Sequence, residues 1–379
     1  MNMKLLIVAG GGGHFAPALA VIEKLPKDTD VMVVGRKYAF EQDKTLSFEY
    51  LTSQKLGLNF QTITTGRLQR KITTHTLTSL IKVPVGYFQA LKLLKEFKPD
   101  AVLSFGGYVS LPVAFAAKTL KIPLVIHEQI LGAGLANKVA AKFAARICVS
   151  WEQSKKFFPA EKVVLTGNPM RKAVSYNSQL VTPKENLPII YVTGGSGGAH
   201  SINILIEDCL EKLLEKYIVI HQTGDAREFG DFDRLEKKRK SLPLALQARY
   251  TPVKFVDSKE VFAVLDKADL VVARSGINTV TELLAAGKPC ILIPLPYGQY
   301  NEQLTNALFV RQLGLGIAAE QKDLTGDKLY ALINSTIKDL DEFKKHSKEA
   351  RELIIPDAAE KIIKIIEHVS NEKKNITQS

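Results

Sequence analysis

The sequence has little cysteine and tryptophan and no long apolar run. Its three cysteines, Cys148, Cys209 and Cys290, lie in apolar segments without a CxxC spacing, so we expect buried free thiols rather than disulfides or a zinc site. No apolar stretch approaches the roughly 18–20 residues of a membrane span. The opening run from Leu5 to Ala9 is too short for the core of a signal peptide. These absences predict a cytoplasmic protein.

Basic residues outnumber acidic ones. The chain of 379 residues has 51 lysines and arginines against 39 acidic residues, a formal net charge of +12. Such a charge suits nucleic acid, an anionic membrane surface or a polyphosphate ligand. The single tryptophan lies in a segment expected to be helical, and neither an aromatic stripe nor a helix-turn-helix pattern occurs. We therefore expect no nucleic acid partner.

Strand, glycine-rich turn and helix alternate along the chain in two successive series. In the first, residues 4–9 have the pattern of a strand, 10–13 that of a turn and 16–25 that of a helix. The pattern breaks near 167–171 and starts again at residue 189. Alternation of this kind predicts α/β domains built on doubly wound parallel sheets, whose ligands bind at the carboxyl ends of the strands.

Two domains follow from this pattern. We expect Rossmann-like domains over residues 1–168 and 169–355, facing each other across a cleft that holds the site. Residues 356–370 have the pattern of an amphipathic helix, which is expected to pack back on the first domain. Residues 371–379 are polar and expected to fray.

The first glycine turn, Gly10 to Gly13, leads into His14. It is a poor dinucleotide fingerprint, because Phe15 stands at the third glycine position and the second strand ends at Gly35 and Arg36 without an acidic residue for a ribose. NAD is therefore disfavoured, and Arg36 leaves only a small opening for NADP. The turn lets backbone approach a ligand closely, and His14 at its exit is either structural or catalytic.

The second glycine turn, Gly194 to Gly198, follows a predicted strand and precedes a predicted helix. It matches the Gly-x-Ser-x-Gly pattern of a hydrolase nucleophile, but the later histidines His221, His346 and His368 lie in unsuitable places. Alternatively, the turn cradles a phosphate with its backbone N–H groups, the helix N-terminus and the Ser196 hydroxyl. We favour this second interpretation.

A third stretch, Ala273 to Pro294, begins at the end of a predicted strand, Leu270 to Ala273. It continues with a polar turn, a helix expected to begin near Asn278 and a second strand after Pro289. Glu282 lies one turn into that helix, where its carboxylate could bind a pair of ligand hydroxyls. An ordinary αβ crossover explains the pattern equally well.

No metal or cofactor is expected. Asp-x-Asp pairs occur in three charged segments that look surface-exposed and lie away from strand ends: Asp28/Asp30, Asp231/Asp233 and Asp339/Asp341.

Together, the motifs resemble those of MurG-type glycosyltransferases over nearly the whole chain. Nine motifs occur in the family's order: the glycine turn before His14, Phe105 to Ser110, His127 to Gln129, Gly134 to Lys138, Gly167 to Arg171, Gly194 to Ala199, Phe255 to Asp257, Ala273 to Pro294, and Glu302 to Ala307. The resemblance implies the GT-B architecture. It also implies metal-independent, inverting transfer of N-acetylglucosamine from UDP-N-acetylglucosamine to the lipid-linked muramyl-pentapeptide (lipid I), giving lipid II in peptidoglycan synthesis.

The resemblance also implies roles for residues matched by position. His14 would be the general base. The other matched residues would bind substrate: Gly11, Gly12 and Gly13 on the acceptor side; Asn137 in the first domain; Ser196 and Arg171 at the donor diphosphate; Val256 at uracil; Glu282 at the ribose; and Asn278, Thr279 and Gln303 as further donor contacts.

The chain departs from the family pattern at four positions. Gly11 replaces a threonine and Ala9 a glycine in the first turn, while Gly197 and Ile130 replace a glutamine and an asparagine. Gly11 and Gly197 remove side-chain hydrogen bonds but keep backbone donors. Ile130 removes a polar donor contact, so another UDP-sugar, or a glycolipid acceptor, stays open.

A lipid acceptor implies a peripheral protein on the cytoplasmic face of the membrane. Residues 66–88 mix basic with apolar side chains and suit an anionic leaflet, although a connecting loop with a core helix fits them equally well. A UDP-sugar epimerase and a non-catalytic nucleotide-sugar sensor are the remaining alternatives.

Overall fold

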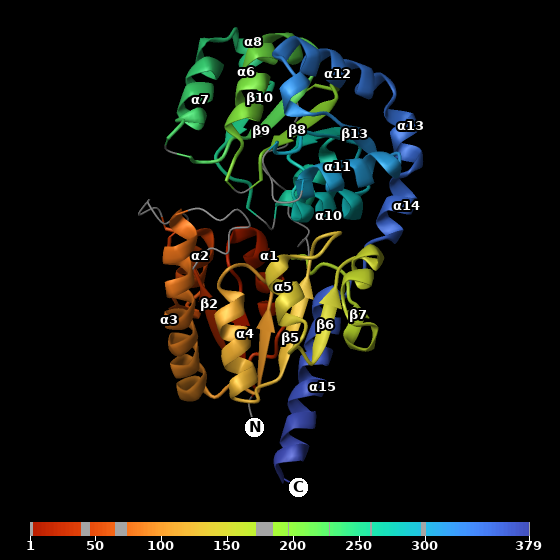
Figure 1. The fold of residues 1–379 in the computed structure, drawn as a ribbon. Helices are drawn as coiled ribbons and strands as arrows, with labels where there is room; N and C mark the ends of the chain where they lie inside the picture. Colours follow the sequence, from red (N-terminus) through yellow and green to blue (C-terminus); the bar gives the residue numbers. More distant parts are fainter. Residues whose placement is uncertain are drawn as a thin grey trace. The chain divides into compact units, whose positions relative to one another are not determined.

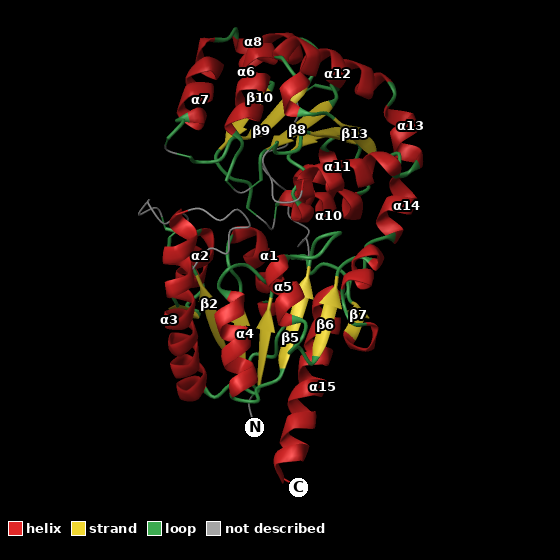
Figure 2. Cartoon of the chain, viewed as in Figure 1, coloured by secondary structure: helices red, strands yellow, loops and turns green. Residues whose placement is uncertain are grey.

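A computed structural model describes residues 3–38, 46–64, 74–171, 185–195, 197–226, 228–257, 260–296 and 301–378. The chain divides into two compact units (Figure 1). The first contains residues 1–171 and 355–379, and the second contains residues 172–354. Each unit is a sheet of parallel strands with helices packed against it (Figure 2), so the predicted α/β class with parallel sheets is confirmed.

The first unit has a seven-stranded sheet in the order β3-β2-β1-β4-β5-β6-β7, in which every neighbouring pair is parallel. Its strands are β1 (Lys4–Val8), β2 (Asp30–Gly35), β3 (Asn59–Thr62), β4 (Ala101–Ser104), β5 (Leu124–Glu128), β6 (Arg146–Val149) and β7 (Val163–Leu165). Its helices are α1 (Gly12–Ile22), α2 (Phe48–Lys55), α3 (Thr74–Phe97), α4 (Ser110–Thr119), α5 (Leu135–Ala140) and α15 (Ala358–Gln378), with 3-10 turns at Glu152–Phe157 and Ala160–Lys162.

The second unit has a six-stranded parallel sheet in the order β10-β9-β8-β11-β12-β13. Its strands are β8 (Ile189–Thr193), β9 (Ile218–Gln222), β10 (Tyr250–Val253), β11 (Leu270–Ala273), β12 (Cys290–Leu292) and β13 (Gly316–Ala318). Its helices are α6 (His200–Leu214), α7 (Asp231–Ser241), α8 (Leu244–Gln247), α9 (Val261–Lys267), α10 (Ile277–Ala286), α11 (Glu302–Gln312), α12 (Gly326–Lys338), α13 (Leu340–Lys345) and α14 (Ser347–Glu352), with a 3-10 turn at Gln321–Asp323.

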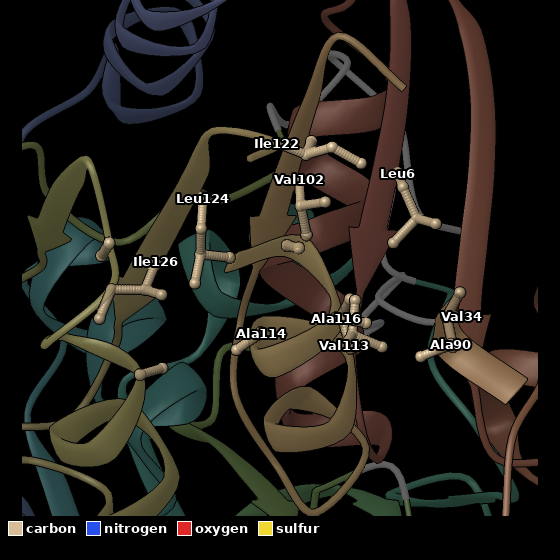
Figure 3. Close-up of a cluster of buried hydrophobic side chains, with 14 of the residues drawn as sticks. Leu6, Val34, Ala90, Val102, Val113, Ala114, Ala116, Ile122, Leu124 and Ile126 are labelled. Atoms are coloured by element: carbon tan, nitrogen blue, oxygen red, sulfur yellow. The ribbon is translucent and has the colours of Figure 1, made fainter. Parts of the chain in front are cut away.

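Successive strand residues point to opposite sides of the first sheet, and helices bury both sides. On one face, Leu6 and Val102 pack with residues of α3 and α4 such as Ala90 and Val113 (Figure 3). On the other face, residues of α1 and α15 cover Leu5 and its neighbours. Helices on both faces leave the carboxyl ends of the strands as the place for polar side chains.

The C-terminal helix α15 packs on the first sheet through Ile362 and Ile366, which are fully buried. The structure corrects the expectation of a frayed end for residues 371–378, because α15 runs to Gln378; Ser379 lies outside the described residues. Near the end of this helix, Lys374 forms an ion pair at 3.2 Å with Asp100, the residue before β4.

The three cysteines are buried free thiols, as predicted.

The helix after the first glycine turn begins at Gly12, four residues earlier than predicted, so Gly12, Gly13 and His14 belong to its first turn.

Candidate active site

Two glycine turns meet at the carboxyl end of the first sheet. The turn after β1 contains Gly10 and Gly11, and Gly11 precedes α1 with φ of 117°. Its neighbour is the turn after β4, where the Gly106 carbonyl accepts a hydrogen bond from the Gly10 N–H. A Cβ on Gly107, which has φ of 84°, would lie 2.7 Å from the Gly10 carbonyl oxygen. This backbone contact therefore requires glycine at residue 107.

His14 lies beside these turns and is partly buried. Its Nδ1 is 3.0 Å from Nε2 of Gln129, an amide donor, so Nδ1 accepts the hydrogen bond. Burial lowers the pKa of His14 to about 4; a hydrogen bond to the Phe105 backbone opposes this, and the charge of Arg36 lowers it further. His14 is therefore neutral at pH 7, the state that a general base requires.

Glu128 at the end of β5 has a structural role. Its Oε2 accepts hydrogen bonds from the Gly134 N–H at 2.8 Å and from Nδ2 of Asn137 at 3.1 Å, and its Oε1 accepts from the Ile130 N–H at 3.3 Å. The buried carboxylate thus holds the loop that leads to α5.

Asn137 is buried against the same strand end. Its Nδ2 also donates to the His127 carbonyl at 3.1 Å, while its Oδ1 has no hydrogen-bond partner among the residues that the structure describes. The imidazole of His127 is fully buried and contacts the Gly167 carbonyl through Nε2 at 3.0 Å. Burial lowers the pKa of His127 to about 4, so this side chain is a neutral core histidine.

Arg171 belongs to the first unit and is held there by an ion pair with Glu23. Its Nε donates to Glu23 Oε2 at 2.9 Å, and a second N–H bonds the other carboxylate oxygen. Glu23 follows the last residue of α1, so Arg171 is tied to the far end of the helix that begins at the first glycine turn. This ion pair uses the edge of the guanidinium formed by Nε and Nη2.

The second glycine turn joins β8 to α6, and its backbone is close to a neighbouring loop. A Cβ on Gly198, which has φ of 74°, would lie 2.2 Å from the Thr223 carbonyl oxygen. Ala199 precedes α6, whose first turn contains no acidic residue. Ser196, predicted to bind the diphosphate, lies outside the described residues.

Gln222, at the end of β9, connects the second turn to the predicted uracil segment. Its Oε1 accepts hydrogen bonds from the Tyr191 hydroxyl at 2.8 Å and from the Val256 N–H at 3.3 Å. Its Nε2 donates to the Gly195 carbonyl at 3.0 Å. Sequence reasoning missed Gln222, although a polar residue that ends a buried strand of a parallel sheet is a usable signal.

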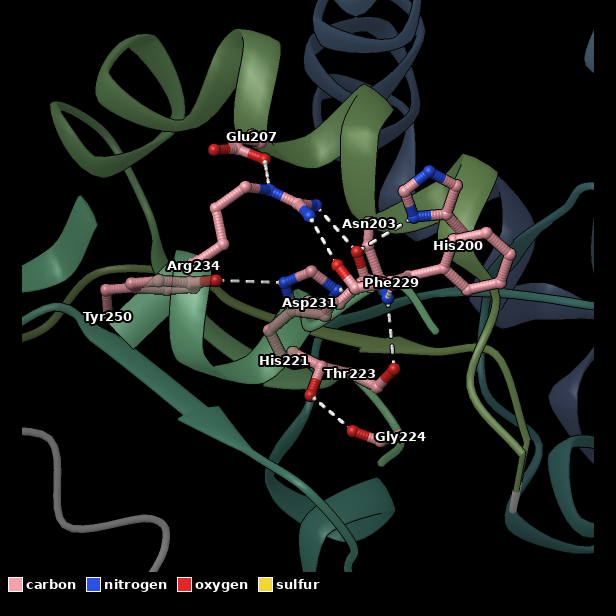
Figure 4. A network of polar contacts seen from close by, with 10 residues as sticks. All are labelled: His200, Asn203, Glu207, His221, Thr223, Gly224, Phe229, Asp231, Arg234 and Tyr250. Carbon is pink, nitrogen blue, oxygen red and sulfur yellow. Dashed lines mark hydrogen bonds and ion pairs between the residues drawn. The ribbon is translucent and has the colours of Figure 1, made fainter. Parts of the chain in front are cut away.

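A buried polar network extends from the start of α6 to α7 (Figure 4). Asp231 accepts hydrogen bonds from Asn203 at 2.7 Å, from Arg234 at 2.6 Å and from Nδ1 of His200 at 2.8 Å. The expectation that Asp231 is a surface residue is therefore wrong, because it is buried from solvent. Three hydrogen-bond donors satisfy its buried carboxylate. His221, enclosed between Asn203 and the Tyr250 hydroxyl, completes the network.

Arg274, directly after β11, is a buried cation with neutral partners. Its Nη1 donates to the carbonyls of Ile293 and Pro294, and its Nη2 donates to Ser201 Oγ at 2.6 Å and Gln321 Oε1 at 2.7 Å. Burial lowers the pKa of Arg274 to about 10, so it remains charged at pH 7. Its charge lies beside the second residue of α6, where it favours an anionic ligand. Sequence reasoning missed this residue too.

The helix α10 carries three of the predicted donor contacts. It begins at Ile277, one residue before the predicted start, and Asn278 and Thr279 in its first turn are partly exposed. Burial raises the pKa of Glu282 to about 7. Gln303 of α11 lies beside this segment: its carbonyl accepts from Ser275 Oγ at 2.7 Å, and its Oε1 accepts from the Leu295 N–H at 2.9 Å.

Apart from Ser196 and Arg171, the predicted residues fall into two sets, one in each unit. Gly11, Gly12, Gly13, His14 and Asn137 gather at the strand ends of the first sheet; Val256, Asn278, Thr279, Glu282 and Gln303 follow strand ends of the second. Over the described ranges, no group of three or more His, Cys, Asp or Glu side chains is arranged to hold a metal ion.

Known proteins match this chain along almost all of its length. The models of the glycosyltransferase family 28 N-terminal and C-terminal domains match residues 5–149 and 189–362. The UDP-N-acetylglucosamine–N-acetylmuramyl-(pentapeptide) pyrophosphoryl-undecaprenol N-acetylglucosamine transferase of Geotalea uraniireducens is 34% identical over 371 residues, which cover 95% of this chain and 97% of the relative.

Solved structures of related proteins match this chain as well. The crystal structure of MurG from Acinetobacter baumannii matches with a TM-score of 0.70 and 25% identity, covering 96% of this chain and 99% of that one. A UDP-GlcNAc 2-epimerase from Neisseria meningitidis shares the fold, with a TM-score of 0.61 and 15% identity over 96% of this chain and 99% of that one. The chain belongs to glycosyltransferase family 28 and, within it, to the MurG family of N-acetylglucosamine transferases.

Proposed function

We propose that this protein transfers N-acetylglucosamine from UDP-N-acetylglucosamine to a lipid-linked muramyl-pentapeptide, the step that makes lipid II. The observation that carries the proposal is the end-to-end match to transferases of that name. The name of that relative specifies a pyrophosphoryl-undecaprenol lipid as the acceptor, and we extend this acceptor to the present chain.

We assign the donor to the second unit. Glu282 takes the ribose hydroxyls, the Val256 backbone meets uracil, and Gln303, Asn278 and Thr279 supply further contacts. Ser196 holds the diphosphate, and Arg171, which belongs to the first unit, is assigned to the same group. Arg274 supports this assignment, because a buried cation without a carboxylate partner among the described residues stabilises a nearby anion.

We assign the acceptor and the base to the first unit. The acceptor hydroxyl attacks the anomeric carbon while His14 takes its proton. The bond from that carbon to the β-phosphate oxygen breaks, and UDP leaves with the electron pair, inverting the anomeric configuration. The neutral state of His14 supports this role, and general base catalysis contributes roughly 10²–10⁴ in rate.

We further propose that the protein binds the cytoplasmic face of an anionic membrane through α3. Val85 and Phe88 on this helix are exposed, Phe88 to 66%. The basic residues Arg67 and Arg70 lie outside the described residues. No helix in the described part of the chain has the length and apolarity to cross a bilayer. Salt-sensitive sedimentation with anionic liposomes, compared with neutral ones, tests the proposal; equal binding to both would contradict it.

The decisive experiment is a panel of UDP-sugars assayed with the lipid-linked muramyl acceptor. We expect disaccharide product from UDP-N-acetylglucosamine and UDP release only when acceptor is present; UDP release without acceptor would indicate an epimerase instead. Binding of UDP without any turnover would indicate a sensor. His14→Ala should lower turnover by about 10²–10⁴. Near-normal turnover would remove His14 from the base role.

A further inference from the structure

Arg36, the residue after β2, lies against the first glycine turn. A Cβ on Gly11 would fall 2.9 Å from Nη2 of Arg36, so the guanidinium occupies the space that a side chain at residue 11 would need. The backbone of Arg36 is anchored as well, because its carbonyl accepts a hydrogen bond from the Ser47 hydroxyl. Arg36 thus reaches the carboxyl end of the first sheet beside His14.

One edge of this guanidinium is already held. Its Nε lies 3.4 Å from Oε1 of Glu49, a residue of α2 that is only 1% exposed, whereas the Arg36 side chain is 28% exposed. Glu49 is the one carboxylate paired with Arg36 in the part of the chain that the structure describes. The Nη end faces the glycine turn, and α1 behind it has no acidic residue in its first turn.

We propose that Arg36 is the phosphate-binding residue of the acceptor site and holds the pyrophosphoryl group of the lipid against the Gly11 turn. This inference rests on the proposed function, which makes the acceptor a pyrophosphoryl lipid and assigns the donor diphosphate to the other unit. The geometry suits phosphate, because a guanidinium donates two parallel N–H groups to two phosphate oxygens, and Nε is the edge that Glu49 uses.

Arg36 also acts on His14 through its charge. After burial, the positive charge of Arg36 is what lowers the pKa of His14, and His127 of β5 is the other titratable group coupled to it. Gln129, which bonds His14 Nδ1, is neutral. A diphosphate on Arg36 would offset the positive charge, so binding of the acceptor would make His14 a stronger base.

The test compares Arg36→Gln with Arg36→Lys and with Lys37→Gln. Lys37 is a matched control, since it is the next residue, is exposed, and has its ammonium over Tyr38 and Tyr50 rather than at the turn. In transfer assays with varied lipid acceptor, Arg36→Gln should raise the acceptor KM about 10- to 100-fold, as expected for loss of a charge-assisted hydrogen bond, with donor KM within about twofold. The acceptor KM of Arg36→Lys should lie between those of wild type and Arg36→Gln, and that of Lys37→Gln should equal the wild-type value.

Two further measurements separate phosphate binding from support of the fold. With a muramyl acceptor analogue that lacks the diphosphate, Arg36→Gln and wild type should have equal KM. The acid limb of the kcat/KM profile should move to higher pH in Arg36→Gln, because the charge that lowers the His14 pKa is gone. An unchanged acceptor KM, or an equal loss with and without the diphosphate, would overturn the proposal.

Direct binding keeps the inference independent of turnover. With the donor site saturated by UDP, a soluble prenyl pyrophosphate should bind wild type and Lys37→Gln alike and Arg36→Gln at least about tenfold more weakly. If wild type transfers no sugar but binds this probe through Arg36, the proposed function fails and the phosphate site stands. Equal binding by all three proteins refutes the phosphate site. The double variant Arg36→Gln/Glu49→Gln, which leaves no unpaired buried carboxylate, replaces Arg36→Gln if the single variant melts early.

Discussion

Protonation of Glu282 should make donor binding depend on pH. Burial raises the pKa of this carboxyl to about 7, and no described residue supplies a cation to it. In the proposed complex, two ribose hydroxyls donate hydrogen bonds to the carboxylate, which stabilises the charged form and lowers its pKa. Binding therefore requires the deprotonated carboxylate, and affinity should rise as the pH rises through 7.

The magnitude follows from the fraction of Glu282 that is ionised in the free protein. With a pKa of about 7, one molecule in about eleven is ionised at pH 6 and nearly all are ionised at pH 8. The Kd for UDP-N-acetylglucosamine should therefore fall up to about tenfold between these pH values. At pH 7, binding should release about half a proton per site.

Calorimetry in buffers of different ionisation enthalpy measures both quantities. UDP-N-acetylglucosamine is the appropriate ligand, because its diphosphate is a diester without a group that titrates in this range. Glu282→Gln is nearly isosteric and should abolish the proton release while weakening binding about 10- to 100-fold at pH 8. Proton release that persists in Glu282→Gln, or a wild-type Kd that does not change with pH, would refute the assignment of Glu282 to the ribose.

Two further predictions concern stability. Gly107→Ala should lower the free energy of unfolding by about 1–3 kcal/mol in urea titrations, because the new Cβ would lie 2.7 Å from the Gly10 carbonyl oxygen at a φ of 84°. Gly13→Ala is the control: its Cβ would have no neighbouring atom within 4 Å, so the free energy of unfolding should not fall. Burial lowers the pKa of His221 to about 3, below its value in the unfolded chain, so between pH 6.5 and 3 the unfolded chain binds more protons. Stability should fall with decreasing pH by about 1.4 kcal/mol per unit from this group, and His221→Gln should flatten the dependence.

The sheets were predictable because their signals are local. Alternation of apolar strands with glycine turns located β1, β8 and β11 within a residue or two of their observed bounds. The start of α1 was missed because glycines disfavour helix in isolation, while here Gly12 and Gly13 lie in its first turn. The continuation of α15 was missed because the ion pair of Lys374 joins residues that are distant in sequence.

Candidate site residues could be named from the sequence where a motif carries its own geometry, whereas contacts between distant segments were missed. His14 and Glu282 follow recognisable turns, so their places could be expected. The bonds of Gln222 to Gly195 and of Arg171 to Glu23 join residues 27 and 148 positions apart, and no local pattern announces them. The Asp231 network misled for the same reason, since the segment that follows Asp231 is rich in charged residues while its partners are in α6 and at the start of α7.

The contact between Arg36 and the first glycine turn explains one departure from the family pattern. Gly11 lacks the threonine expected there, and the Arg36 guanidinium fills the vacated space, so a neutral hydroxyl is exchanged for a cation beside His14. That exchange would cost basicity at His14 unless an anion binds at the same place. A glycine at residue 11 is thus compatible with base catalysis if the acceptor itself carries the compensating charge, which under the proposed function would favour a phosphorylated acceptor over a neutral glycolipid.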